Sequence, residues 1–199
     1  SSSSAASDVY KRQDVDAHVT TVLFNDQYKM LYNRRELKDV SKMTDKDYTP
    51  GGMTALLDAV GRTIHKMDMV AGIHRKDKGN KVLFVIITDG EENDSKEYTY
   101  ADVKKLIKDR QENAGWEFIF LGANIDAAAA AENLGIDRDR AVKYKNTGSG
   151  VRANFKAVAE LSDSLAKSGR VSDRWKETVE KDEDDAADKQ SAAVTSHRR

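Results

Sequence analysis

One apolar run and the two residues after it constrain the fold of this chain more than any other feature. Residues 82–88 are all apolar or β-branched, which is typical of a strand buried on both faces of a parallel sheet. The run ends at Asp89 and Gly90. Ligands of open α/β sheets bind outside the carboxyl ends of central strands, so Asp89 is a candidate site residue. An Asp-Gly turn that only ends the strand explains this position equally well.

Strand-like and helix-like segments alternate around this run. Residues 18–24 and 28–33 are rich in β-formers and flank an Asn-Asp-Gln turn, so they predict a hairpin. The other expected elements are a helix opened by Thr54, the strand 82–88, a helix after Thr99, a strand at 116–121, a helix after Asp126, an edge strand at 141–144 and a helix over 151–165. This order predicts an α/β, Rossmann-like doubly wound domain with a mainly parallel sheet and one antiparallel edge hairpin.

The 199 residues divide into one domain with two ends. Residues 1–13 lack hydrophobic periodicity, and residues 8–13 resemble the translated transposon end of sequencing libraries, so we expect a non-native extension and a missing natural start. A disordered native N-terminus is the alternative. The domain is expected over 14–169. Residues 170–199 are charged and rich in Ala and Ser, which indicates a disordered tail with at most a short helix around Trp175.

Composition excludes several classes of partner and site. The 33 basic and 34 acidic residues are mixed along the chain, so no basic face indicates nucleic acid and no polybasic stretch indicates a membrane. The absence of cysteine excludes disulfides and thiolate metal sites, and it fits a reducing compartment such as the cytoplasm.

Thr54 follows Gly51-Gly52 and precedes a helical stripe of apolar residues. Its hydroxyl either caps the amides of that helix or points toward a ligand. Taken alone, the threonine favours the capping role.

Several of these motifs together resemble the von Willebrand factor A domain, in particular its stand-alone bacterial and phage members. The resemblance covers roughly residues 17–168. Its motifs are VLFND at 22–26, GGMTALLDAVGRTI at 51–64, VIITDGEE at 85–92 and WEFIFLGANID at 116–126.

The resemblance implies a metal ion-dependent adhesion site. The family builds that site from an Asp-x-Ser-x-Ser motif, a threonine and an aspartate, and Thr54 and Asp89 match the last two. Hydroxyl and carboxylate oxygens suit Mg²⁺. No Asp-x-Ser-x-Ser occurs before residue 50, so the site is partial and Mg²⁺ binding by this chain should be weak or absent.

The family's first strand and first helix are also absent from this sequence. In the family, that strand lies between the strands expected at 18–24 and 82–88. Its absence should either leave two interior strand edges open or force these two strands to pair directly.

The implied function is a non-catalytic, metal-dependent module in which Mg²⁺ bridges to an acidic side chain of a protein partner. One alternative is a scaffold domain with a vestigial metal site. The other is a Mg²⁺-dependent phosphoryl-transfer enzyme that uses Asp89. Against the enzyme, the sequence has no glycine-rich phosphate loop, no Asp-x-Asp pair at a strand end and no His arrangement for covalent catalysis.

Overall fold

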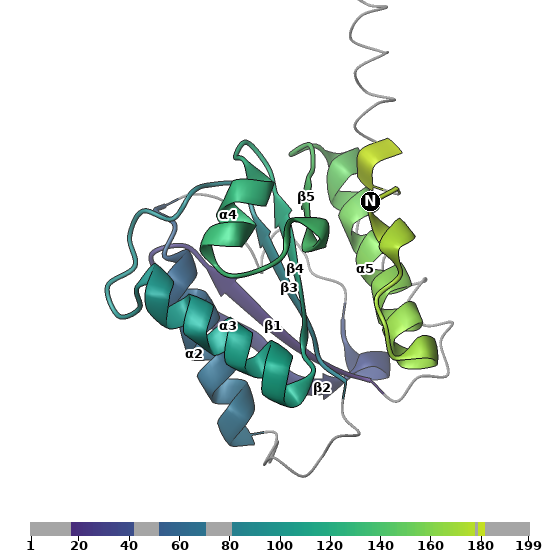
Figure 1. Cartoon of the computed structure of the whole chain (residues 1–199), viewed down its shortest axis with the longest axis horizontal. Coiled ribbons are helices and arrows are strands. Elements are labelled where there is room, and N and C mark those ends of the chain that lie inside the picture. Colours follow the sequence, from purple (N-terminus) through teal and green to yellow (C-terminus); the bar gives the residue numbers. More distant parts are fainter. Residues whose placement is uncertain (1–16, 42–51, 71–80, 178, 182–199) are drawn as a thin grey trace, which may run out of the picture.

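The computed structural model describes residues 17–41, 52–70, 81–177 and 179–181, which form a mixed α/β structure (Figure 1). The main elements are β1 (His18–Phe24), β2 (Tyr28–Glu36), α2 (Leu56–Val70), β3 (Leu83–Thr88), α3 (Tyr100–Ala114), β4 (Glu117–Gly122), α4 (Ala127–Asn133), β5 (Ala141–Lys143) and α5 (Gly148–Ser168). The α/β class and the predicted order of elements are therefore confirmed. The extension expected at 1–13 and the end of the tail, 182–199, lie outside the described residues.

Strands β1 and β2 form the predicted antiparallel hairpin, with Phe24 opposite Tyr28. The turn is closed locally, because the Asn25 side chain accepts a hydrogen bond from the Gln27 amide at 2.7 Å. Asn favours such turns since its short side chain can bond the backbone two residues on.

Strands β3, β4 and β5 form a parallel sheet in that order. Strand β4 is central, and β5 lies at the edge, as the sequence predicts. The register pairs Leu83 with Glu117 at one end of β3 and Thr88 with Gly122 at the other, so β3 and β4 are paired along their whole length.

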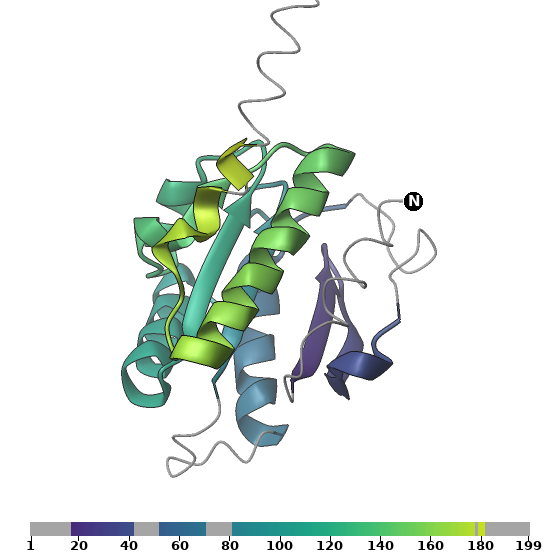
Figure 2. The ribbon, with the colours of Figure 1, turned by 90° about the vertical axis from the view of Figure 1, so that its right-hand side faces the viewer.

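Helices cover both faces of this sheet (Figures 1 and 2). Phe118 and Phe120 of β4 pack into one cluster with residues of α2, α3 and α4. Ile119 and Leu121 alternate with them and pack into a second cluster with α5. All four side chains are fully buried, and burial of each one contributes about 1.5–3 kcal/mol. The period-2 alternation of a strand thus divides one apolar run between two cores.

Local signals end and begin the helices as predicted. Thr99 and Asp102 form a capping box at the start of α3, and Gly115 ends that helix with a φ of 66°. Asp126 caps α4 by accepting from the amide of Ala129. No helix among the described residues is both long and apolar enough to cross a membrane.

The prediction that residues 82–88 are buried on both faces is wrong, and so is the single sheet that includes the hairpin. Only Ile86 and Thr88 of β3 are buried, and Ile87 is 37% exposed. Among the described residues, β3 pairs with β4 alone and the hairpin forms a sheet of its own. Within the described part of the chain, one edge of β1 and one edge of β3 therefore have no strand partner.

The packed part of the chain extends beyond Gly169. Val171, Trp175 and Val179 are at most 5% exposed and belong to the cluster between the sheet and α5. A short 3₁₀ turn, Asp173–Lys176, carries Trp175. The start of the segment expected as a tail thus contributes to the core.

Candidate functional site

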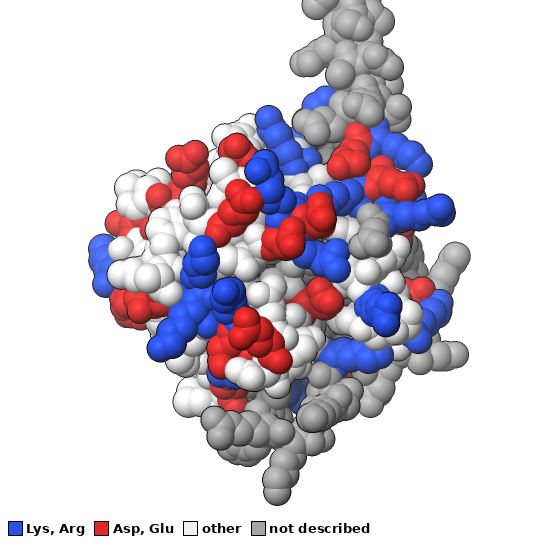
Figure 3. Space-filling view, viewed as in Figure 1, with Lys and Arg blue, Asp and Glu red and all other residues white. Residues whose placement is uncertain are grey.

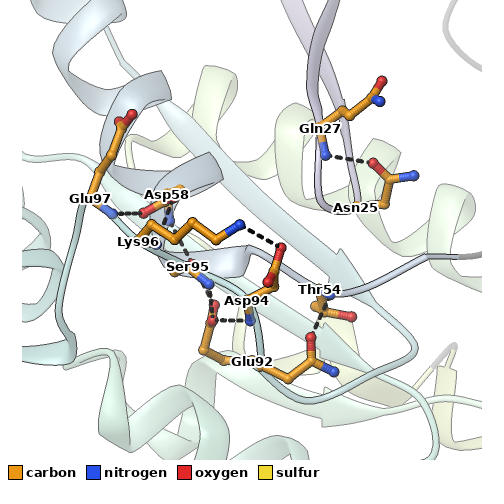
Figure 4. Close-up of polar contacts among 10 residues, drawn as sticks. Asn25, Gln27, Thr54, Asp58, Glu92, Asp94, Ser95, Lys96 and Glu97 are labelled. Atoms are coloured by element: carbon orange, nitrogen blue, oxygen red, sulfur yellow. Dashed lines mark hydrogen bonds and ion pairs between the residues drawn. The ribbon is translucent and has the colours of Figure 1, made fainter.

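The carboxyl ends of β1 and β3 meet at the start of α2 (Figure 4). The amide of Ala55 donates to the carbonyl of Asn25, just after β1, at 2.8 Å. The amide of Thr54 donates to Asn93 Oδ1 at 2.7 Å, and the amide of Asn93 donates back to the carbonyl of Thr54 at 3.0 Å. Thr54 is therefore held between the loops that follow the two strands.

Thr54 does not cap α2, so the capping prediction is wrong. The amide of Leu57 donates to Glu92 Oε2 at 2.9 Å, and the amide of Asp58 donates to Ser95 Oγ at 3.1 Å. Side chains of the loop after β3 thus satisfy the first amides of the helix. Within the described part of the chain, the Thr54 hydroxyl makes no hydrogen bond that would occupy it.

The Thr54 hydroxyl instead lies beside the end of β3. A Cβ built on Gly90 would be 3.1 Å from Thr54 Oγ1, closer than most Cβ contacts, so glycine permits this approach. Thr88 Oγ1 donates to the carbonyl of Gly90 at 2.9 Å and so holds the turn after β3. Thr54 and the Asp89-Gly90 turn therefore occupy one edge of the molecule, as the resemblance implies.

Asp89 is exposed, and its Oδ2 accepts a hydrogen bond from Asn146 Nδ2 at 3.1 Å. Asn146 lies between β5 and α5, so this contact joins the ends of two strands of the parallel sheet. Asn146 was not among the site residues predicted from the sequence. Its position directly after an expected strand, at the edge where Asp89 also lies, was the signal that could have identified it.

Two further carboxylates hold the loop after β3 against α2, and both were missed. Glu92 accepts from the amides of Leu57, Asp94 and Ser95 and from Ser95 Oγ, at 2.7–3.0 Å. Asp58 accepts from three successive loop amides at 2.9–3.0 Å. These roles were hard to predict from the sequence, because the bonds that join the loop to α2 connect residues 35 to 40 positions apart.

Asp58 is buried on α2 at 6% exposure. Burial by itself raises its pKa, but the amides of Lys96, Glu97 and Tyr98, together with the Arg62 guanidinium, outweigh burial and hold the pKa of Asp58 below its ordinary value. Asp58 is therefore an ionised structural acceptor, and its two oxygens are already engaged.

The arrangement offers a small number of hard oxygen donors at one edge. Glu92 and Asp58 have their oxygens engaged by hydrogen bonds. The exposed Asp89 carboxylate, by contrast, accepts a hydrogen bond only from Asn146 among the described residues. The Thr54 hydroxyl and the Asp89 carboxylate are donor types that Mg²⁺ accepts. The described residues contain no group of three or more His, Asp or Glu side chains placed to hold a metal ion. Two protein oxygens would leave most of an octahedral shell to water, which fits weak binding.

No protein-family model matches this chain, and no curated protein matches it. The resemblance to von Willebrand factor A domains therefore stays an expectation from the motifs around Thr54 and Asp89.

Proposed function

We propose that this chain is a von Willebrand factor A-like domain with a partial metal ion-dependent adhesion site. In this proposal Mg²⁺ is held by Thr54 and Asp89, and it bridges to an acidic side chain of a protein partner. The domain then acts as a non-catalytic binding module, and the cytoplasm is the compartment that fits a chain without cysteine.

The observation that carries the proposal is the placement of the Thr54 hydroxyl. A threonine just before a helix would ordinarily cap it. Here Glu92 and Ser95 bond the first helical amides. The hydroxyl is left beside Gly90, the residue that follows the exposed Asp89. Because the hydroxyl has no role in capping the helix, its position at this edge supports a ligand there.

Binding is favoured over catalysis by the chemistry of the edge. Among the described residues, the Asp89 carboxylate contacts the Asn146 amide, and the Glu92 carboxylate of the same loop is engaged by backbone amides and a hydroxyl, so neither is arranged as a nucleophile with an adjacent general base. Lys/Arg and Asp/Glu side chains are interspersed on the face drawn in Figure 3, which gives no electrostatic preference for nucleic acid there. A bound dication would supply the positive charge that an acidic partner needs.

The scaffold with a vestigial site remains the second candidate. It is supported by the small number of protein oxygens at the edge and by the open strand edges of β1 and β3. Under that reading Thr54 and Asp89 bind no metal at millimolar concentration. A Mg²⁺-dependent phosphoryl-transfer enzyme is the third candidate and has the least support.

The decisive experiment is a titration with Mn²⁺, followed by paramagnetic broadening of backbone amide signals in nuclear magnetic resonance. We expect binding with a dissociation constant on the order of millimolar, with the signals of Thr54 and Gly90 broadened first. Mg²⁺ should compete with Mn²⁺ for the same site. Adding acetate as a stand-in for a partner carboxylate should perturb the same signals only in the presence of Mg²⁺.

Variants separate the metal site from folding. Asp89→Ala should abolish the broadening, and Thr54→Ala should reduce it while changing the free energy of unfolding by less than about 0.5 kcal/mol, because no helical amide loses its partner. Asp39→Ala, at an exposed position outside the site, is the matched control and should change neither property. Broadening that persists in Asp89→Ala, or its absence in the unsubstituted chain, would refute the proposal and leave the scaffold.

A further inference from the structure

The loop after β5 reaches the exposed Asp89 through one side chain, that of Asn146. Asn146 Nδ2 donates to Asp89 Oδ2 at 3.1 Å, across 57 positions of the sequence. Among the described residues, neither side chain makes a second hydrogen bond. Both are exposed, so water competes for this bond and it contributes little to folding. Its main effect is therefore on the position of the Asp89 carboxylate.

The backbone is held on both sides of Asn146. Before it, the amide of Tyr144 donates to the last carbonyl of β4 at 3.0 Å, and the Tyr144 side chain is buried. After it, Thr147 caps α5 by accepting from the amide of Gly150 at 3.2 Å. A Cβ on Gly150 would overlap the carbonyl oxygen of Lys145, so this close approach requires glycine. The end of a strand and the start of a helix thus present Asn146 to Asp89 from a well-packed support.

The contact with Asn146 engages one of the two oxygens of the Asp89 carboxylate. Asp89 Oδ2 accepts the amide proton, and no donor reaches Asp89 Oδ1 within the described part of the chain. Ca²⁺ takes roughly six to eight oxygens in a flexible shell and often binds both oxygens of one carboxylate. Mg²⁺ requires a smaller octahedral shell, retains several waters and is satisfied by one oxygen of a carboxylate. An engaged Oδ2 therefore disfavours Ca²⁺ more than it disfavours Mg²⁺.

We propose that Asn146 is a positioning residue that makes the edge at Thr54 and Asp89 selective for Mg²⁺ over Ca²⁺. By holding Asp89 Oδ2, it leaves one oxygen of the carboxylate, Oδ1, for a cation. The amide nitrogen of Asn146 is a donor and faces the carboxylate, so Asn146 orients the ligand and does not itself bind the cation. Hydrogen-bond partners of metal ligands commonly change metal affinity by about 10–100-fold. The inference rests on the metal site proposed above and adds the cation preference of that site.

The test measures the preference between the two cations directly. Mn²⁺ broadens the amide signal of Gly90, and separate titrations with Mg²⁺ and Ca²⁺ as competitors give a dissociation constant for each. The unsubstituted chain should bind Mg²⁺ more tightly than Ca²⁺. Asn146→Ala releases Asp89 Oδ2, so the ratio of the two constants should fall at least about tenfold. Asn146→Gln keeps an amide donor on a longer side chain and should restore part of the preference.

The matched control is Asn113→Ala. Asn113 Nδ2 donates to Asp109 Oδ1 at 2.7 Å on exposed α3, so this substitution removes the same kind of contact. Asn113 lies just before β4, at the amino ends of the parallel strands, whereas Asp89 and Asn146 lie at their carboxyl ends. Asn113→Ala should leave the cation preference unchanged. The melting temperature of the metal-free chain should be nearly the same in both Ala variants, because both contacts are exposed.

Three outcomes would overturn the inference. The first is a cation preference that is unchanged in Asn146→Ala. The second is an equal loss of affinity for both cations, which would make Asn146 a ligand or a structural residue. The third is a chain that binds Ca²⁺ as tightly as Mg²⁺. In each of these outcomes the unsubstituted chain still binds metal, so the proposed metal site survives. Only the absence of metal binding by the unsubstituted chain would overturn both proposals together.

Discussion

Replacing Asp58 should weaken the attachment of the loop after β3 to α2. The Asp58 carboxylate accepts three backbone hydrogen bonds, with Oδ2 bonded to the Lys96 amide and Oδ1 to the amides of Glu97 and Tyr98. No other carboxylate reaches those amides among the described residues. The perturbation is Asp58→Asn, which keeps the shape of the side chain and changes one oxygen into a donor.

The magnitude follows from the bond pattern. In the Asn variant, the remaining oxygen can keep the bonds to the amides of Glu97 and Tyr98. The new NH₂ group faces the Lys96 amide, and because both groups are donors, that hydrogen bond is lost. One hydrogen bond to a charged group is worth about 1.5–3 kcal/mol. We therefore expect Asp58→Asn to lower the free energy of unfolding by roughly 2 kcal/mol. Asp58→Ala loses all three bonds, but water can reach the exposed Lys96 and Glu97, so the loss should be about 3 kcal/mol.

The measurement is urea unfolding followed by the fluorescence of Trp116 and Trp175. Both are buried, so their emission should change on unfolding. The midpoint should fall without a change in the slope of the transition, because the surface exposed on unfolding is the same. Glu112→Gln, an exposed change on α3, is the control and should stay within about 0.5 kcal/mol of the parent.

The pH dependence gives an independent check. The pKa of Asp58 is held below its usual 3.8 in the folded state, so the unfolded chain binds the proton more readily. Its contribution to stability is present above that unfolded value and is lost as the pH falls through the folded pKa. The difference between parent and Asp58→Asn should therefore be largest near neutral pH and shrink below about 3.8. Equal stabilities at neutral pH, or a difference that grows on acidification, would refute the reasoning.

Two further substitutions test the packing around the site and the end of the domain. Gly61→Ala should lower the free energy of unfolding by about 1–3 kcal/mol in thermal or urea unfolding, because the new Cβ would lie 2.6 Å from the Tyr98 ring. A gain in stability, which is usual for Gly to Ala in a helix, would show that the ring can move. Trp175→Ala should cost about 3–5 kcal/mol in the same assay, with Trp175→Phe nearer the parent, and an unchanged midpoint would mean that this segment does not stabilise the core.

The elements that the sequence predicted correctly depend on near neighbours in the chain. The Asn25 turn, the Thr99 and Asp102 capping box and the left-handed Gly115 each close within a few residues. The spacing of apolar residues identified β4 as a strand and α5 as a helix, because the number of residues between side chains on one face is a local property of the backbone. The edge at which Asp89 and Thr54 lie also followed from local pattern, because parallel strands place their carboxyl ends together.

The remaining features of the site depended on contacts distant in sequence. The first amides of a helix require acceptors, but the sequence does not specify which acceptors reach them. Thr54 was adjacent and had the right chemistry, yet Glu92 and Ser95, more than 30 residues away, took that role. Asn146 reached Asp89 across 57 residues in the same way.

The exposure of β3 could not be derived from its composition. An apolar run indicates that a strand is suited to burial, whereas burial itself depends on how many strands and helices surround it. The sequence by itself therefore determined the type and order of the elements. Only the tertiary structure decided that β3 pairs with β4 alone among the described residues, that the hairpin contacts α2, and that the Thr54 hydroxyl lies beside Gly90. Local backbone preferences act over a few residues, but pairing and packing depend on which distant segments meet.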